Sequence, residues 1–413
     1  MAPTTPTSPS AGHRYGPRLT LDDLNRALLA RQHLSTRADA TVLDEVRHLV
    51  GLQSQVPSSP YPGLWSRLAS FTTDDLGDRL LDRSVVRLGT LRGTVHLVAA
   101  DDALELAAHA RPAMAAHLRS RNQHGTALAD VDLDDLERAA EDLLAEPLTS
   151  VELGRRLAAR WRDVGPTQLA YGARCLLPLV QVPPRGLWGA SGPGTATTWT
   201  TADAWLGRSR HDLDGVAHGT DAAAVLAARV RLVRRYLAAF GPASVADAQR
   251  WAGLTRLRAA FDRLRPELAT FTGPGDVELF DLPDAPRPGG DAPVPVLLVA
   301  DFDNLVLAHA DRARVLADLP VQRVVSINGQ VAATVLVDGR VTGSWTWTVE
   351  RAAGDAVVRV EVRPLARRDG GHEGPRAPAG ALRETDVLDQ VVERAADWSR
   401  VAAPGATPQV VLS

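Results

Sequence analysis

A repeated helix start is the feature that most limits how this chain can fold. Residues 147–152 (PLTSVE) and residues 242–247 (PASVAD) both read Pro-x-Ser/Thr-x-x-acid. In such a capping box the Ser or Thr side chain accepts a hydrogen bond from the helix backbone, and the acid three residues later bonds back to the cap. A third box, TLDD, starts at Thr20. We therefore predict helices that begin directly after these three boxes.

The two repeats are followed by the same order of elements. Each capped helix leads to a second helical stretch and then to two extended apolar segments around a Gly/Pro-rich loop, over residues 181–205 and 267–282. A helix-turn-helix followed by a hairpin is the winged-helix plan, and ordinary α+β pieces without a role in DNA binding share this pattern. The sequence thus contains a weak internal repeat.

The composition changes beyond Pro283, where Val-rich runs begin. Asn328-Gly329 and Asp338-Gly339 each separate alternating apolar segments, as two-residue hairpin turns require. We predict a small antiparallel sheet or barrel there. A Gly/Pro-rich loop over residues 370–380 and a helix over residues 384–399 are expected to follow it.

Length and cysteine content set the broad class. At about 100 to 200 residues per domain, 413 residues make two to four domains, and no stretch approaches the roughly 18 apolar residues of a membrane span. The single cysteine, Cys175, can form neither an internal disulfide nor a zinc cage, which fits a cytoplasmic protein. Residues 1–17 are rich in Pro, Thr and Ser and lack the apolar core of a signal peptide, so we expect a disordered leader.

The net charge of −3 hides two opposite blocks. Residues 222–265 hold nine Arg against two Asp, whereas residues 128–146 hold eight acidic residues against one Arg. The basic block can bind phosphate groups through counterion release, and a solvated helix face explains it equally well. The residues of this block that we single out for DNA binding are Arg229, Arg231, Arg234 and Arg235.

Several enzyme classes are excluded by what the sequence lacks. All 46 basic residues are arginine, so neither a Schiff-base lysine nor a phosphate-loop lysine is available. The eleven histidines form no metal-binding pattern, and no Gly-x-Ser-x-Gly nucleophile elbow occurs. We expect no catalytic metal and no cofactor.

Two glutamines, Gln53 and Gln55, end an apolar run just before a proline-broken loop. They can direct both amides toward one pocket. A glutamine amide is no general base near neutral pH, but its carbonyl can orient a water molecule and stabilise developing positive charge. Such a pair suits a reaction whose leaving group is already activated, and a purely structural role explains the same residues.

Two further clusters are polar. The segment 90–96 (TLRGTVH) predicts a short strand with Arg92, Thr94 and His96 on one face, and we expect these three side chains to contact DNA. A half-buried strand whose polar groups satisfy one another is the alternative. The other polar cluster holds Asp301, Asp303, Asn304, His309, Asp311 and Arg312. An ionic network that joins domains explains it as well as a functional site does, and we assign it no catalytic role.

The chain resembles the AlkZ-type winged-helix DNA glycosylases from about Leu19 to Trp398. Four regions carry the resemblance in order along the chain. They are the segments GLQSQ (51–55) with WSR (65–67), LRGTVHL (91–97), GPASVAD (241–247) with Trp251, and TVLVDGR (334–340) with Gly343 and Trp345.

The resemblance implies an α+β molecule that cradles duplex DNA in a C shape, with three tandem winged-helix units and a C-terminal antiparallel β-barrel-like domain. It also implies hydrolysis of the N-glycosidic bond of alkylated purines, and in some members the unhooking of interstrand crosslinks. Gln53 and Gln55 match the family's Gln-x-Gln motif. The expected division is a leader (1–17), winged-helix units at 18–125, 126–215 and 216–290, and the barrel-like domain at 291–413.

From the resemblance and the residues together we expect a metal-independent, monofunctional DNA glycosylase that acts on bulky N7-alkylated purines as a monomer, in the cytoplasm and on the nucleoid. A hairpin turn at Asn328-Gly329 or at Gly273-Pro-Gly275 is a candidate to enter a DNA groove. The main alternative is a non-catalytic winged-helix DNA-binding protein or transcription regulator. A small-molecule or drug-binding protein is the third interpretation.

Overall fold

The structure is a computed structural model that describes residues 15–190, 196–352, 355–365 and 384–412. Most of the expected leader and the whole 370–380 loop lie outside these residues. Residues 15–17, which we assigned to the leader, instead run along strand β7 (Ala269–Thr272), where the Thr272 amide donates to the Pro17 carbonyl at 2.9 Å. Residues 15–17 therefore belong to the folded part of the molecule, contrary to their assignment to the leader.

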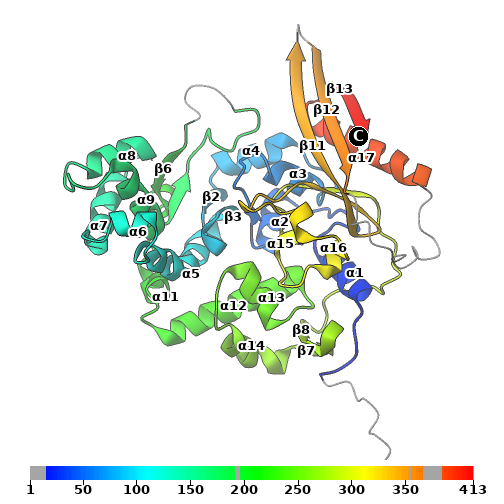
Figure 1. Ribbon diagram of the computed structural model, residues 1–413, viewed down its shortest axis with the longest axis horizontal. Helices are drawn as coiled ribbons and strands as arrows, with labels where there is room; N and C mark the ends of the chain where they lie inside the picture. The colour runs from blue at the N-terminus through cyan, green and yellow to red at the C-terminus, as the bar shows by residue number, and fades with distance from the viewer. Residues whose placement is uncertain (1–14, 191–195, 353–354, 366–383, 413) are drawn as a thin grey trace, which may run out of the picture.

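The N-terminal region combines short helices with a three-stranded part of a sheet (Figure 1). The capping box at Thr20 is confirmed, and an unpredicted one begins helix α4 at Thr72. In chain order the elements are α1 (Leu21–Arg31), α2 (Val42–His48), β1 (Leu52–Gln53), α3 (Pro60–Trp65), α4 (Thr73–Leu81), β2 (Val85–Gly89), the 3-10 turn η1 (Leu91–Gly93), β3 (Val95–Ala99) and α5 (Ala100–Leu118).

The next region repeats this order of helices and hairpin and shares the same sheet. Thr149 caps α8 with the predicted box, and Leu88 of β2 pairs with Val180 of β5, so the sheet has six strands in the order β1-β3-β2-β5-β6-β4. The elements are α6 (Gln123–Ala127), α7 (Leu133–Leu143), β4 (Leu148–Thr149), α8 (Ser150–Leu157), α9 (Pro166–Leu176), β5 (Leu179–Gln181), β6 (Thr198–Thr201) and α10 (Ala202–Leu206).

A third set of helices with a two-stranded hairpin lies below the first two regions in Figure 1. The Ser244 capping box is confirmed, and both strands predicted around Gly273-Pro-Gly275 are present. The elements are η2 (His211–Leu213), α11 (Asp214–Ala217), α12 (Ala222–Phe240), α13 (Val245–Ala252), α14 (Arg258–Leu264), η3 (Arg265–Glu267), β7, η4 (Pro274–Asp276) and β8 (Glu278–Asp281).

The C-terminal region holds an open sheet, and the expectation of a barrel-like domain is wrong. Its five strands follow the order β13-β12-β11-β10-β9, with β9 and β13 as separate edges in the described residues. The last strand also pairs parallel to β12, so the sheet is not wholly antiparallel. The elements are β9 (Leu297–Val299), α15 (Asn304–Leu307), α16 (Ala313–Leu316), η5 (Val321–Arg323), β10 (Thr334–Val337), β11 (Arg340–Ala352), β12 (Asp355–Pro364), α17 (Glu384–Ala402) and β13 (Thr407–Leu412).

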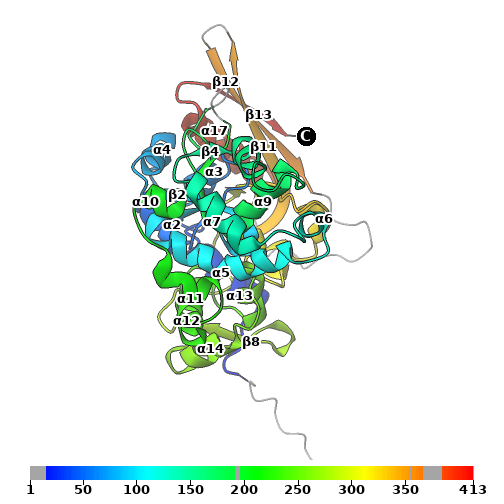
Figure 2. The ribbon, with the colours of Figure 1, turned by 90° about the vertical axis from the view of Figure 1, so that its left-hand side faces the viewer.

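Helix α17 explains why the sheet stays open. It packs against β9, β12 and β13 and buries Trp398 completely, so the helix rather than a further strand covers the apolar face. The long hairpin of β11 and β12 projects beyond the rest of the molecule in both ribbon views (Figures 1 and 2). The mixed α+β class is therefore confirmed, without barrel closure.

The two predicted hairpin turns behave differently. Asp338 and Gly339 both have positive φ, 49° and 72°, and join β10 to β11 in the tight two-residue turn that the sequence predicted. Asn328-Gly329 forms a tight turn flanked only by the single bridge between Val325 and Val331, so the hairpin predicted there is wrong. The preceding apolar segment, residues 323–327, forms no strand: it begins at the end of the 3-10 turn η5 and contributes only the bridge at Val325.

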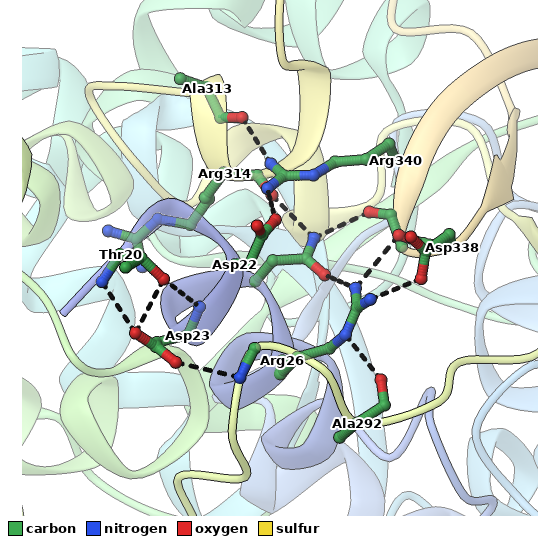
Figure 3. Close-up of polar contacts among 12 residues, drawn as sticks. Thr20, Asp22, Asp23, Arg26, Ala292, Ala313, Arg314, Asp338 and Arg340 are labelled. Carbon is green, nitrogen blue, oxygen red and sulfur yellow. Dashed lines mark hydrogen bonds and ion pairs between the residues drawn. The ribbon is translucent and has the colours of Figure 1, made fainter. Parts of the chain in front are cut away.

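Polar contacts fix the Asp338-Gly339 turn against the N-terminal helix α1 (Figure 3). Arg26 forms an ion pair with Asp338, and Asn25 Nδ2 donates to the Gly339 carbonyl at 2.8 Å. A side chain at Gly339 would start 2.3 Å from Asn25 Oδ1, so only glycine fits this close approach. Helix α1 thus joins the two ends of the chain into one body.

The largest apolar core runs through several of these regions. It includes Leu28 of α1, Leu237 of α12 and Trp251 of α13 together with Val299 of β9 and Leu305 of α15. Because residues from both halves of the chain share this core, the loop after β9 is held next to the N-terminal Gln53 segment. This packing positions the site described below.

Candidate active site

A sharp turn places the Gln-x-Gln motif on the edge of the six-stranded sheet. Helix α2 ends near Leu49, the chain turns with positive φ at Gly51, and β1 follows. A Cβ on Gly51 would lie 2.7 Å from Val98 Cγ1 and 2.9 Å from the Leu97 carbonyl oxygen, so the turn requires glycine. Gln53 therefore pairs directly with His96 of β3.

Gln53 is held by an arginine from the neighbouring turn. Arg92 Nη2 donates to Gln53 Oε1 at 2.8 Å. Gln53 is only 8% exposed. Arg92 Nη1 also donates to the carbonyl of Trp251 in α13. The motif is thus tied, through one guanidinium group, to a helix two hundred residues further along the chain.

His96 completes this group as a neutral imidazole. Its Nε2 lies 3.2 Å from Arg92 Nη2 and its Nδ1 lies 3.0 Å from the Thr94 carbonyl oxygen, so Nδ1 carries the proton and Nε2 accepts. Burial, together with repulsion by Arg92, lowers the pKa of His96 to about 3. The side chain therefore stays uncharged at neutral pH. We call Gln53, Arg92 and His96 the glutamine corner.

The predicted strand over residues 90–96 is wrong in its first half. Leu91–Gly93 is a 3-10 turn in which Arg92 has a φ of 58°, and the strand β3 starts only at Val95. Gly93 in the turn favours this reversal because it also adopts positive φ. Arg92 and His96 still meet, but through the turn rather than along one strand face, and Thr94 Oγ1 donates to the Leu91 carbonyl at 3.3 Å.

Gln55 lies in a different environment from Gln53. It is exposed, and its Oε1 accepts from the Val95 amide at the long distance of 3.4 Å. Ser54 between the two glutamines is buried, and its amide donates to the Val95 carbonyl at 2.8 Å. The structure therefore fixes one glutamine and leaves the other facing solvent close by.

Arg250 of α13 acts electrostatically on both Arg92 and Arg312. Burial lowers the pKa of Arg92 to about 10, and repulsion from Arg250 of α13 adds to this effect. Arg250 also lowers the pKa of Arg312, second to burial. None of the three has an acidic partner within 4 Å among the described residues. Sequence reasoning missed Arg312 for this role and did not separate Arg250 from the basic block.

The predicted DNA-binding arginines of α12 are mostly paired with acids. Arg231 contacts Glu105 at 2.8 Å, Arg235 contacts Asp102 at 2.7 Å, and Arg234 pairs with Glu267. Arg229 Nη1 donates to the Arg256 carbonyl at 3.5 Å. Their role in binding DNA stays a prediction.

The exposed turn at Asn328-Gly329 makes no polar contact with the described residues of the corner. No hydrogen bond or ion pair among the described residues joins it to Gln53 or Arg92. Its neighbour Ile327 is fully exposed. A role for this turn in a DNA groove also stays a prediction.

The segment after β9 is the main part of the site that sequence reasoning undervalued. Asp303 forms a buried two-bond ion pair with Arg67, both bonds being 2.8 Å long, and Asn304 Nδ2 donates to the Gly51 carbonyl at 2.9 Å. The ionic network between regions is therefore confirmed for Asp303. It reaches the turn that presents Gln53, which only the fold could reveal.

A wide groove begins on the other side of β3. It is lined by Val95 and Thr90 near the motif and extends past Met114, Tyr171 and Trp199. Its walls combine apolar side chains with carboxylates and arginines of α5, α7 and α9. The groove offers room for a large, mixed polar and apolar group next to Val95, whose amide donates to Gln55.

Neither a cluster of metal-ligating side chains nor a membrane-spanning helix occurs in the part of the chain that is described. Across residues 15–190, 196–352, 355–365 and 384–412, no three His, Cys, Asp or Glu side chains gather as a metal site would require. Within the same residues, no helix has both the length and the apolar character needed to span a membrane.

Comparisons with known proteins agree with this arrangement. A sequence profile of the AlkZ-like DNA glycosylases matches residues 46–398. The interstrand DNA cross-link repair glycosylase of Streptomyces sahachiroi is 27% identical over 332 residues, which cover 77% of this chain and 85% of that protein.

The fold has a solved counterpart as well. The structure of the Streptomyces sahachiroi DNA glycosylase AlkZ superposes with a TM-score of 0.69 at 20% identity, covering 96% of this chain and 100% of the other. At this level of identity the likeness concerns the fold. Together with the profile match over most of the sequence, it leads to one conclusion: the chain belongs to the AlkZ-like family of DNA glycosylases.

Proposed function

We propose that this protein hydrolyses the N-glycosidic bond of bulky N7-alkylated purines in duplex DNA and unhooks interstrand crosslinks built on them. The observation that carries the proposal is the glutamine corner, in which Arg92 fixes Gln53 beside the exposed Gln55. The Streptomyces sahachiroi relative is named for crosslink repair, which supports the same substrate class. Base excision repair or self-resistance to a DNA-alkylating antibiotic would use this activity.

The chemistry suits these residues. A purine alkylated at N7 is cationic and leaves as a neutral base, so it needs little help from an acid, whereas the sugar develops positive charge that a carbonyl dipole can stabilise. In our proposal Gln53, fixed by Arg92, orients the attacking water. Gln55, free to move, turns its carbonyl toward the sugar. The reaction needs no metal ion.

The groove beside Gln55 would hold the bulky part of the adduct. A crosslinked base cannot swing freely out of the helix, so such an enzyme needs an open site instead of a closed base-flipping pocket. The groove starts at Val95, whose amide contacts Gln55, and it is wide and partly apolar. These features favour an adduct with aromatic or apolar groups.

The DNA would lie across tandem winged-helix units. The order of helices followed by a hairpin recurs three times, which supports units at 18–125, 126–215 and 216–290, with the open-sheet domain at 291–413. We propose that these units form a C-shaped cradle that binds duplex DNA as a monomer and associates with the nucleoid. Phosphate contacts would come from Arg92, Arg250 and Arg312 and from the α12 arginines.

A single-turnover excision assay tests the proposal. The protein is incubated with duplex DNA that carries one bulky N7-alkylguanine, with a metal chelator present, and abasic sites are then cleaved with alkali. We expect strand breaks with the wild type and none with the Gln53→Ala/Gln55→Ala variant. Tight binding to undamaged DNA without breaks in any substrate would instead favour a transcription regulator, and affinity for the free drug alone would favour a drug-binding protein.

A further inference from the structure

A small polar cavity lies directly beside Gln53. Its walls include Gln53, Ser59 and Asp301 together with Asn304, and it has room for about one water molecule. Asn304 is only 5% exposed, and its Oδ1 has no hydrogen-bond partner among the described residues. A buried acceptor without a partner is costly, and a water molecule in this cavity would satisfy it.

Asp301 lines the same cavity, as does Ser59, whose hydroxyl interacts with the Asp301 carboxyl group. Burial raises the pKa of Asp301, the Ser59 hydroxyl opposes this shift, and the negative charge of Asp303 adds to the increase. No ion pair within 4 Å holds Asp301 in the described part of the chain. The carboxylate also interacts with the Ser59 hydroxyl and with its own backbone amide. Its two oxygens have about four acceptor sites, so lone pairs remain that can accept a proton from a bound water.

The neighbouring carboxylate is not available for that task. Asp303 accepts two bonds from Arg67, and its Oδ1 also accepts from the Leu305 amide at 2.8 Å as the cap of α15. Arg67 is thus neutralised by Asp303 and leaves Asp301 uncompensated. Asp301 and Asp303 lie in the same loop, but of the two only the Asp301 carboxylate is free of an arginine in the described chain and able to accept a proton.

The proposed reaction lacks an acceptor for one proton. The attacking water must lose a proton, and neither glutamine amide can take it near neutral pH. We propose that Asp301, together with Asn304, binds the attacking water beside Gln53 and accepts its proton, acting as the general base of the glycosylase reaction. This inference rests on the function proposed above.

The step balances as follows. The water oxygen forms a bond to C1′ of the sugar while the bond from C1′ to N9 of the purine breaks. The electron pair of that bond leaves with the purine and neutralises its N7 cation. The proton of the water passes to the Asp301 carboxylate and then to solvent.

The test compares the wild type with Asp301→Asn in single-turnover excision at saturating protein. The variant keeps the size of the side chain and removes its basicity, so we expect the rate constant to fall about 100-fold, as is typical for the loss of a general base. Only the carboxylate form is active. The wild-type rate should therefore decline as the pH falls through the raised pKa of Asp301, and Asp301→Asn should lack this decline.

A second variant and two controls keep the test decisive. Asp301→Glu retains a carboxylate, so it should keep the decline at low pH and recover part of the rate even if Asp301→Asn folds poorly. Thermal unfolding and DNA affinity should match the wild type in both variants. An Asp301→Asn rate within about threefold of the wild type, or an unchanged pH profile, overturns the inference while the proposed function stands; a wild type that excises no base overturns both.

Discussion

The glutamine corner and helix α12 carry the same cationic side chain in opposite settings. In the corner, burial and repulsion from Arg250 lower the pKa of Arg92 to about 10, and Arg250 also lowers the pKa of Arg312, second to burial. On α12, three arginines face carboxylates of α5 and η3. The corner therefore holds positive charge that lacks a counterion in the described chain, whereas most of the charge of α12 is already neutralised within the protein.

This difference teaches where an anion would bind most favourably. A phosphate group near the corner would relieve repulsion between guanidinium groups. On α12 a phosphate group would have to displace the carboxylate that is already paired with the arginine. Exposed ion pairs of this kind are weak, so this displacement costs little. We therefore expect the corner to control catalysis, Arg250 and Arg312 to control most of the affinity, and α12 to add a smaller and more salt-dependent share.

The largest effect is expected from Gln53→Ala. The change removes the carbonyl that Arg92 holds and leaves the guanidinium group without its amide partner. We expect the single-turnover rate constant to fall about 100-fold or more, comparable to the loss of one preorganised polar group in other active sites. Gln53→Glu serves as the matched control for shape, and a loss below about threefold would break the assignment.

A smaller effect is expected from Arg92→Lys. Lysine keeps the charge but cannot bond Gln53, the Trp251 carbonyl and His96 at the same time, because it lacks the planar fork of arginine. Excision should slow about tenfold while DNA affinity changes little. Equal rates for lysine and arginine would show that only the charge matters at this position.

The next effect concerns affinity. Arg250→Ala and Arg312→Ala should each weaken DNA binding. Each should also reduce the steepness of the plot of log K against log salt concentration by about one, which corresponds to the loss of one phosphate contact. The rate constant at saturating protein should stay close to that of the wild type. The measurement is a salt titration of binding to the same damaged duplex, and an unchanged slope would remove these residues from the DNA-binding surface.

The smallest effect is expected on α12. Arg231→Ala, Arg234→Ala and Arg235→Ala should each lower affinity by about twofold at low salt, because every one of these side chains must first leave a carboxylate. The matched variant Glu267→Gln frees Arg234 and should raise affinity slightly. If Arg234→Ala cost more affinity than Arg250→Ala, the comparison between the two regions would be reversed.

Local chemistry explains which parts of the fold the sequence predicted. The boxes at Thr20, Thr149 and Ser244 and the turn at Asp338-Gly339 depend on neighbouring residues, and each was found as expected. The barrel failed because closure depends on which strands meet at the edges. In this fold helix α17 covers the apolar face of the sheet, and no short sequence pattern predicts this long-range contact.

The site shows the same limit. Gln53 and Gln55 stand out in the sequence, but the partners that separate their roles come from elsewhere, since Arg92 reaches Gln53 through a turn with positive φ. The basic block of 222–265 looked uniform partly because two of the acids that pair with it, Asp102 and Glu105, lie over a hundred residues away. A role for Asp301 could be inferred only from the fold, which places it in one cavity with Gln53.

The most direct test of the central claim measures rate and affinity separately for the two double variants Gln53→Ala/Gln55→Ala and Arg250→Ala/Arg312→Ala on one N7-alkylguanine duplex. We predict that the glutamine variant binds the duplex as tightly as the wild type but excises no base at saturating protein. The arginine variant should bind more weakly and excise at nearly the wild-type rate once saturated. A glutamine variant that still excises the base at saturation would contradict the assignment of the bond-breaking step to the glutamine corner.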